Sequence, residues 1–354
     1  MPIPPLYGHE GTRNRLVGAI ASGRLPQALL FEGPRGVGKQ RLALWLAQAL
    51  VCERAGGKAG GEAREGCGEC QPCKLVLNLS HPDVHWFVPL EPSKRSGDAD
   101  KQVDVAEEAL GAEMAARREQ PLYEPPSGLA IHGIAAIRLL LRRLALKPAL
   151  GQRNVFVIAD AERLVPQVGT EAAANALLKA LEEPPPNTVF VLTAAEPEAL
   201  LPTILSRVVR VRVARLADSI VAAFAQRELG MTGQRAVAQR VAAADGCIGR
   251  VLAEGERQDR GGEAAERFAA AVKAGPVRRY AFALGQQPFQ ARGGFTEMLD
   301  GLLERLREQA RSGEDTGRVV RAIAQVLEAR TLAQGNLNPQ LVAAVLGSDL
   351  GTAG

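Results

Sequence analysis

The sequence predicts an α/β protein with a parallel sheet, followed by helical domains. Short apolar runs at 26–31, 154–160 and 188–193 are typical of buried strands, and helical patterns separate them. Strands that alternate with helices favour a parallel sheet with crossover connections. A glycine-rich turn after the first run leads into an apolar helix, which is also typical of α/β folds. Beyond Leu216 the strand signal ends, and Ala- and Leu-rich helical segments continue.

The first 50 residues predict a lead-in helix, a strand at 26–31, a glycine turn at 33–40 and a helix from Arg41 through Val51. The stretch 91–120 interrupts this pattern, because it offers few large apolar residues. We expect a surface insertion there, with partial helix as one option, and assign it no definite secondary structure.

An amphipathic helix is expected to begin at Ile134, with apolar residues at helical spacing and Arg138, Arg142 and Arg143 largely on another face. Pro148 ends this pattern, and the strand at 154–160 follows. These arginines could contact phosphate groups, although such faces are commonly just solvated.

Three further elements follow the strand that contains Asp160. A helix is expected from about 170 to 183, where a run of three prolines ends it, and a strand at 188–193 comes next. The run 208–213 alternates between valine and arginine, which predicts a strand with one apolar and one basic face. The basic residues here are Arg210, Arg212 and, just beyond, Arg215.

Composition places the chain among ordinary globular proteins. It has 354 residues, 46% hydrophobic and 23% charged, and 43 Lys and Arg against 39 Asp and Glu give a net charge of +4. This charge permits nucleic-acid binding without arguing for it, and 4% aromatic residues argue against recognition by base stacking. No signal peptide and no apolar run of about 18 residues occurs, so we expect a cytoplasmic protein without a membrane span.

A phosphate-binding loop is predicted between the first strand and helix. Gly33, Gly38 and Lys39 match the G-x-x-x-x-G-K pattern, with Gly36 as a further glycine inside it. Glycines let backbone N–H groups approach phosphates, and the lysine neutralises their charge. Gln40 stands where Ser or Thr would bind Mg²⁺, so the loop could hold ATP or ADP while lacking one metal contact. The simpler interpretation is a glycine turn that only joins strand to helix.

Asp160 lies where the metal-binding acid of a P-loop ATPase belongs, at the end of a strand. In one register Asp160 is this acid, and Ala161 replaces the glutamate that activates water, with Glu162 displaced by one residue. In the other register Ala159 replaces the acid and Asp160 stands at the glutamate position. Either register is defective, which predicts poor ATP hydrolysis; an ordinary strand-end aspartate is the alternative.

Four cysteines predict a structural zinc site. Cys52, Cys67, Cys70 and Cys73 supply four thiolates, the number that closes a tetrahedral zinc, whereas a catalytic zinc would keep one position open. A redox pair or a coincidence of buried cysteines is the alternative. His81 and His85 are close enough in sequence to compete as ligands but are better explained structurally, and we expect the lone Cys247 to be packed in the core. These three residues therefore stay outside the predicted site.

The motifs together resemble the clamp-loader branch of the AAA+ ATPases, and most closely the delta-prime subunits of bacterial DNA polymerase III. The resemblance covers about residues 5–255 and rests on the P-loop, the inserted cysteines and three further runs. These are His81-Pro82-Asp83, Asn-Ala-Leu-Leu-Lys-Ala-Leu-Glu-Glu-Pro-Pro at 175–185, and Leu-Pro-Thr-Ile-Leu-Ser-Arg at 201–207. The last two runs are far more specific than a single P-loop.

By this resemblance, Arg207 is an arginine finger that reaches the ATP of an adjacent subunit and stabilises charge on its γ-phosphate. Without the flanking motif, Arg207 would be interpreted as a salt-bridged arginine at a strand start. Thr193 lies near the family's first sensor, with alanines in the neighbouring polar places. Gly249 stands where ATP-using relatives place the second sensor's arginine, and Arg250 is one residue further on.

The resemblance implies a domain plan and a function. The AAA+ P-loop domain spans 1–212, with the zinc module at 52–73 and the insertion at 91–120; a helical lid spans 213–260 and a helical collar domain 261–354. The implied function is that of a non-motor clamp-loader subunit, which helps to load the sliding clamp onto primed DNA. Its implied partners are the gamma/tau and delta subunits, the clamp and DNA. A gamma/tau-like motor subunit, an independent P-loop ATPase and a zinc-dependent nucleic-acid-binding module are the alternatives.

Overall fold

The computed structural model describes residues 3–55, 65–91, 98–120, 122, 130–165, 171–253, 257–287, 294–311, 316–334 and 337–352. The described residues fall into two compact units, one up to residue 252 and one from 253 onwards. Each unit has its own hydrophobic core.

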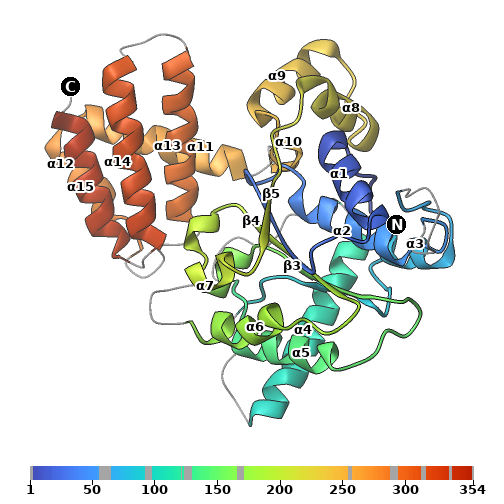
Figure 1. The fold of residues 1–354 in the computed structure, drawn as a ribbon. Helices are drawn as coiled ribbons and strands as arrows, with labels where there is room; N and C mark the ends of the chain where they lie inside the picture. The colour runs from blue at the N-terminus through green and yellow to red at the C-terminus, as the bar shows by residue number, and fades with distance from the viewer. Residues whose placement is uncertain are drawn as a thin grey trace. The chain divides into compact units, whose positions relative to one another are not determined.

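The first unit is built on a parallel sheet of five strands in the order β2-β3-β4-β1-β5 (Figure 1). Strand β1 lies in the interior of the sheet, where Leu30 is in register with Leu192 of β4 and Arg210 of β5. Because all the strands run in one direction, their carboxyl ends meet at one edge. The strands are β1 (Ala28–Glu32), β2 (Val84–Phe87), β3 (Asn154–Ile158), β4 (Thr188–Ala194) and β5 (Val209–Arg212).

Helices cover both faces of this sheet, since successive strand residues point to opposite sides. Leu29 and Phe31 pack with the helices of one face, and Leu30 packs with those of the other. The first face carries α1 (Glu10–Ala21), α2 (Lys39–Val51) and α3 (Gln71–Leu77). The second carries α4 (Ala99–Glu119), α5 (Ile134–Leu144) and α6 (Ala172–Glu182). The result is a three-layer α/β/α arrangement.

Short helices complete the first unit. The 3₁₀ turns η1 (Ala161–Leu164) and η2 (Pro197–Ala199) follow β3 and β4, and α7 (Pro202–Leu205) precedes β5. Helices α8 (Asp218–Glu228), α9 (Gln234–Ala244) and α10 (Ile248–Ala253) then pack around a small core of their own. Val221, Phe224 and Val241 are buried in this core.

All the regular secondary structure in the described residues of the second unit is helical. It comprises α11 (Arg257–Lys273), α12 (Pro276–Leu284), α13 (Gly294–Arg311), α14 (Thr316–Gln334) and α15 (Pro339–Thr352). Phe268, Leu299 and Val326 are fully buried at its centre. Aliphatic and aromatic residues on the inner helix faces therefore hold this bundle together.

The predicted α/β class with a parallel sheet is confirmed, and the expected strands and helices occur within one to three residues of their expected ends. The insertion is more regular than we expected, because 99–119 form one helix. Asp98 caps this helix by accepting a hydrogen bond from the N–H of Lys101 at 2.9 Å, and Val103 and Leu110 bury one side of it. Residues 92–97 of the insertion and 56–64 of the zinc module lie outside the described residues.

Strand β2 is not among the strands that the sequence pattern predicts. It has four residues, and two of them, His85 and Trp86, are not typical of a buried apolar run. Backbone pairing with β3 stabilises this strand, although its local sequence pattern does not favour one. Among the described residues, none of the helices combines the length and the apolar character that a membrane span requires.

Candidate functional site

The glycine loop connects β1 to α2 at the carboxyl edge of the sheet. Gly33, Gly36 and Gly38 all have positive φ angles, of 157°, 77° and 104°, which residues with a side chain rarely adopt. A Cβ at Gly33 would lie 2.3 Å from the carbonyl oxygen of Val213, so the loop also needs glycine for space. The loop leads into α2, a helix of 13 residues. The first N–H groups of this helix form the positive end of its dipole, which is a typical binding position for a phosphate.

Lys39 is folded back onto its own loop. The side-chain ammonium donates hydrogen bonds to the carbonyl oxygens of Gly33 and Pro34, both at 2.8 Å. Burial lowers the pKa of Lys39, and the nearby carboxylates of Asp160 and Glu162 oppose this shift. The lysine is thus held beside the loop that it would serve in phosphate binding.

Gln40 and Asp160 lie in direct contact. The Gln40 amide donates to a carboxylate oxygen of Asp160 at 3.2 Å, and the Asp160 N–H donates to the Thr193 hydroxyl at 3.0 Å. Asp160 has a left-handed backbone, with φ 48°, and lies two residues after the end of β3. The structure therefore brings together Gln40, which stands where Ser or Thr would bind Mg²⁺, the candidate metal-binding acid Asp160 and the candidate first sensor Thr193.

Glu162 points back into the same region from η1. One carboxyl oxygen accepts a hydrogen bond from the Ala195 N–H at 3.1 Å, and the other is buried without a partner among the described residues. Burial raises the pKa of Glu162, and neighbouring Asp160 raises it further. Sequence reasoning noted this residue only as displaced by one position; its burial next to Asp160 depends on the tight turn that follows β3.

The start of α10 contacts the glycine loop through two glycines. The N–H of Gly249 donates to the carbonyl oxygen of Gly36 at 2.8 Å, and a Cβ at Gly249 would lie 2.6 Å from the Gly36 Cα. Any side chain at 249 would therefore push the backbones apart. Arg250, the next residue, directs its guanidinium to Asp245 at 3.6 Å. Neither residue places an arginine over the loop.

Arg207 lies between α7 and β5, and its hydrogen-bond partners belong to α6 and the α7 turn. Its guanidinium donates to the carbonyl oxygen of Thr203 at 2.8 Å, to the Ser206 hydroxyl at 3.1 Å and to the Glu182 carboxylate. The side chain remains 31% exposed, so a partner could reach it. None of these contacts joins Arg207 to the chain's own phosphate loop.

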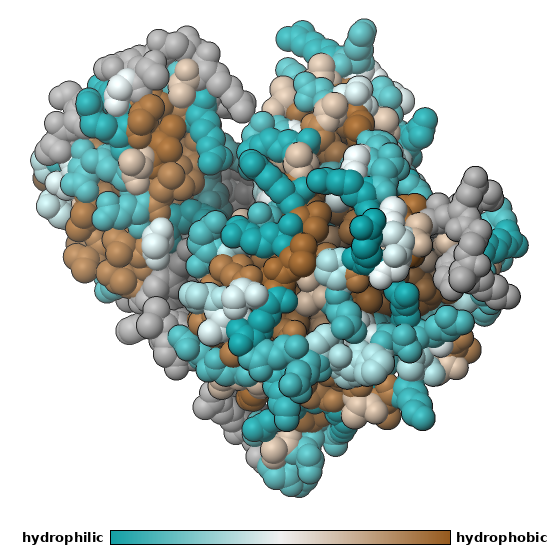
Figure 2. Space-filling model, in the orientation of Figure 1, coloured by the Kyte–Doolittle hydropathy of each residue, from teal (hydrophilic) through white to brown (hydrophobic). Residues whose placement is uncertain are grey.

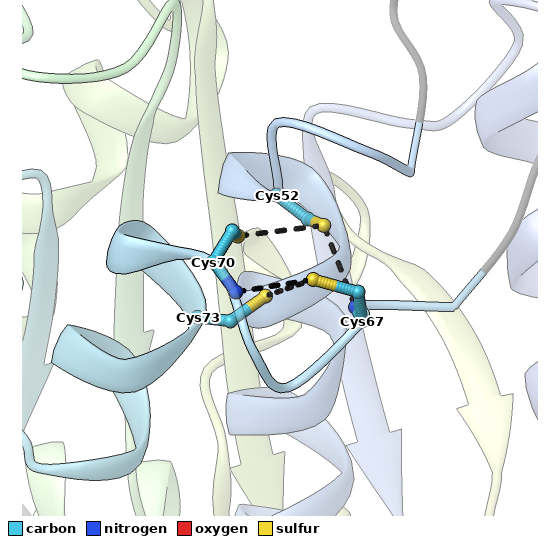
Figure 3. A group of neighbouring side chains, drawn as sticks. All are labelled: Cys52, Cys67, Cys70 and Cys73. Carbon is cyan, nitrogen blue, oxygen red and sulfur yellow. Dashed lines mark hydrogen bonds between the residues drawn. The ribbon is translucent and has the colours of Figure 1, made fainter.

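The four predicted cysteines converge (Figure 3). Cys52 ends α2 and Cys70 begins α3, while Cys67 and Cys73 lie on either side of Cys70 in sequence. The sulfurs all lie within 4.8 Å of one another, with 3.9 Å between Cys67 and Cys73 and 3.8 Å between Cys70 and Cys52. A tetrahedral zinc with bonds of about 2.3 Å separates its sulfurs by about 3.8 Å. The spacing fits such an ion and is too long for disulfides.

Backbone N–H groups point at these sulfurs. The Arg54 and Cys67 N–H groups each donate to the Cys52 sulfur at 3.4 Å, and the Cys70 N–H donates to the Cys67 sulfur at 3.3 Å. Burial alone would raise the pKa of Cys67, but the N–H donors of Cys70 and Glu69 outweigh it and lower this pKa to about 6. Donors of this kind stabilise thiolates, so the cluster suits a cation.

The other metal-ligand candidates lie apart from this cluster. The described groups with metal-ligating spacing comprise the four cysteines alone, without His81 or His85. The His85 ring stacks on Phe156 at 4.7 Å between ring centres, and Cys247 is fully buried in the core beside α2. The roles of His85 and Cys247 are therefore in packing.

Most of the arginines considered for phosphate contact are paired with acids. Arg142 and Arg143 bind Glu107, Arg210 binds Glu32 at 2.6 Å, and Arg215 binds Asp245. These pairs reduce the positive charge that either basic face presents. The case for nucleic-acid binding by these two faces is therefore weaker than their arginine content suggests.

The strand–glycine loop–helix unit at the carboxyl edge of a parallel sheet, with an acid after β3, defines a P-loop α/β fold. Residues 8–217, more than half of the chain, match the DNA polymerase III, delta subunit family. The chain belongs to this family.

Individual relatives agree with this membership. The chain is 33% identical over 193 residues to the DNA polymerase III subunit delta' of Yersinia pestis, which covers 54% of this chain and 43% of the relative. It is 31% identical to the delta' subunit of Escherichia coli K12, over 54% of this chain and 44% of the relative. It is also 32% identical to the gamma/tau subunit of Mycobacterium tuberculosis H37Rv, and the match covers 57% of this chain and 27% of the relative. The chain thus spans less than half the length of these relatives.

A crystal structure of a DNA polymerase III gamma subunit-related protein from Thermotoga maritima covers 97% of this chain and 98% of its own chain. The TM-score is 0.43 and the sequence identity is 17%. The AAA domain of FIGL-1 in complex with ADP covers 77% of this chain, with a TM-score of 0.38 and 14% identity.

Proposed function

We propose that this chain is a delta-prime-type, non-motor subunit of a cytoplasmic DNA polymerase III clamp loader. In this role it joins gamma/tau and delta subunits in a ring that opens a sliding clamp and places it on primed DNA. Family membership over residues 8–217 supports this class of function. The degenerate nucleotide site favours the non-motor role over a gamma/tau-like motor.

The observation that carries the non-motor role is the hydrogen bond between Gln40 and Asp160. A motor subunit needs a hydroxyl at the Gln40 position and a free carboxylate at Asp160 to hold Mg²⁺ beside the phosphates. Here the amide is a poor metal ligand and occupies the carboxylate. Ala161 and Gly249 remove two more groups that hydrolysing relatives would use. ATP or ADP could still bind through Gly33, Gly36, Gly38 and Lys39, without efficient turnover.

Arg207 is proposed as a finger that acts in trans. Its guanidinium is partly exposed and does not contact its own phosphate loop, and it belongs to the Ser-Arg pair of the clamp-loader motif. A rigid guanidinium placed beside a neighbour's γ-phosphate would stabilise the charge that develops there during hydrolysis. The bond to Glu182 would hold the side chain in position before the neighbour docks.

The cysteine cluster is proposed as a structural zinc site. Cys52, Cys67, Cys70 and Cys73 would hold the ion through four thiolates, which leaves no open position for catalysis. The bound zinc would contribute a crosslink between the end of α2 and the start of α3. The backbone donors at Cys52 and Cys67 orient these sulfurs toward a common centre.

The domain division 1–212, 213–260 and 261–354 forms part of this proposal, with the last segment as the collar. Figure 2 shows hydrophobic groups exposed over α14 and the lower end of α15. Large apolar residues are exposed on α12, α14 and α15 of this bundle, and they include Val277, Leu284, Val320, Leu341 and Val345. Such residues suit contact with the corresponding bundles of other subunits.

Reconstitution tests the proposed function. The chain is combined with the gamma/tau and delta subunits and the clamp of its own organism, and clamp loading on primed DNA is measured with and without it. We expect loading and DNA-stimulated ATP hydrolysis to require the chain, and the chain alone to hydrolyse no ATP with Mg²⁺. Robust turnover by the lone chain would favour an independent ATPase or a motor subunit instead, and DNA affinity that is lost on zinc removal would favour a nucleic-acid-binding module.

A further inference from the structure

A cavity of about 430 Å³ lies on the first unit, away from the phosphate loop and the cysteine cluster. It is bordered by α2, the turn after α3, strand β2 and the helices α4 and α5. Its apolar wall includes Leu44, Val76, Leu110 and Met114. The volume lies within the range of small-ligand sites, so the cavity has room for a small molecule or a few residues of a peptide.

His81 lines this cavity with its ring proton in a defined position. The Asp83 N–H donates to Nδ1 of His81 at 3.1 Å, so Nδ1 is an acceptor and the proton of the neutral ring is on Nε2. Burial lowers the pKa of His81, which keeps the ring neutral at pH 7. The side chain is only 4% exposed, and Nε2 has no hydrogen-bond partner among the described residues. A buried N–H donor without an acceptor is unfavourable.

Trp86, the third residue of β2, contributes a second unpaired donor. Its indole Nε1 is buried and likewise lacks an acceptor among the residues that the structure describes. The indole N–H can only donate, so it too calls for an acceptor. His85, the other histidine at the cavity, brings no charge, because burial lowers its pKa to about 4.

Cations border the same cavity. Arg142 and Arg143 both bind the carboxylate of Glu107, which also lines the cavity, at 2.5 and 2.8 Å. Asp104 also contacts Arg142, at 3.3 Å, from outside the cavity lining. Arg143 therefore has only the shared Glu107 as an acid partner among the described residues and keeps donors for another acceptor.

From this set of groups we propose that the cavity binds an apolar molecule that carries a carboxylate. The carboxylate oxygens would accept from the His81 and Trp86 N–H groups or from Arg143, and the apolar body would pack on the Leu110 and Met114 wall. A small organic acid and the C-terminal residue of a peptide are two sources of this chemistry. The proposal does not depend on the nucleotide site or on the proposed function.

Two pairs of probes test the proposal on the full chain. The first pair is 4-phenylbutyrate and its uncharged amide; the second is N-acetyl-Ala-Leu-Phe with a free C-terminal carboxylate and the same peptide as its amide. The indole ¹⁵N–¹H signals report binding, because the chain has two tryptophans and Trp45 serves as an internal reference. We expect one acid or both to shift the Trp86 signal and leave Trp45 in place, with each amide roughly tenfold weaker. Binding of the first acid identifies a small organic acid as the ligand, and binding of the second identifies the C-terminal residue of a peptide.

Variants link the binding to these residues. His81→Asn keeps an acceptor for the Asp83 N–H but removes the Nε2 donor, and Arg143→Gln removes the cation. Each is expected to weaken acid binding roughly fivefold or more. Arg138→Gln, an exposed position on the same helix outside the cavity, is the matched control and should bind as the unaltered chain does. Circular dichroism and thermal melting confirm that each variant is folded.

Three results would overturn the proposal. The first is that neither acid binds. The second is that the amides bind as tightly as the acids. The third is that folded His81→Asn and Arg143→Gln variants bind the acids as tightly as the unaltered chain does.

Discussion

The backbone N–H of Gly249, in the lid, donates to the carbonyl oxygen of Gly36, in the phosphate loop, at 2.8 Å. The two residues are far apart in sequence and each needs to be small, because a Cβ at 249 would meet the Gly36 Cα at 2.6 Å. The start of α10 is therefore fastened directly to the glycine loop.

Gly249→Ala tests this contact. The added methyl group meets backbone rather than a flexible side chain, so we expect a loss of about 1–3 kcal/mol in the free energy of unfolding. Urea denaturation of the full chain measures it. Gly18→Ala, in the middle of α1 with nothing within 4 Å of the added Cβ, is the control and should stabilise by about 0.5–1 kcal/mol. Equal effects at both positions would mean that the lid does not hold the loop.

Removal of one thiolate should release the metal. We expect the purified chain to contain a single zinc ion, and Cys73→Ser to lose it, because three thiolates no longer close the tetrahedron. Elemental analysis measures the content. Cys247→Ala removes a buried cysteine outside the cluster and should keep the zinc. Full zinc content in folded Cys73→Ser would contradict the assigned ligand set.

Asp83 should make stability depend on pH. Burial alone would raise its pKa, but hydrogen bonds from the N–H groups of Ala149, Leu150 and Gly151 outweigh burial and hold the pKa below its ordinary value. The carboxylate thus stabilises the fold fully above its unfolded pKa of about 4, and this contribution is lost as pH falls through the folded pKa.

We therefore expect Asp83→Asn to lose about 2–3 kcal/mol at pH 7, with a difference from the unaltered chain that shrinks below about pH 4. Denaturation across this pH range measures both quantities. Asp98→Asn, a helix cap that asparagine replaces well, should lose little. A difference that stays constant as the pH falls would rule out the carboxylate as its cause.

The sequence was sufficient for features that rest on local pattern. The apolar run before Gly33 and the thiolates around Cys70 predicted β1, the loop and the metal cluster, because strand, turn and ligand spacing are short-range properties. Strand β2 and the contact of Gly249 with Gly36 could not be predicted this way, since both depend on residues distant in sequence. The long helix in the insertion depends on a cap at Asp98 and on burial of Val103, which single-sequence periodicity showed only weakly.

The central claim is that this chain lacks its own ATPase and supplies Arg207 to a neighbour's. Single-turnover ATP hydrolysis by the reconstituted clamp loader on primed DNA, with Arg207→Ala in this chain, tests it most directly. We predict a loss of roughly 10³-fold at the neighbouring site, while the exposed control Arg212→Ala hydrolyses ATP normally. Hydrolysis and clamp loading that are unchanged in a fully assembled Arg207→Ala complex would contradict the account.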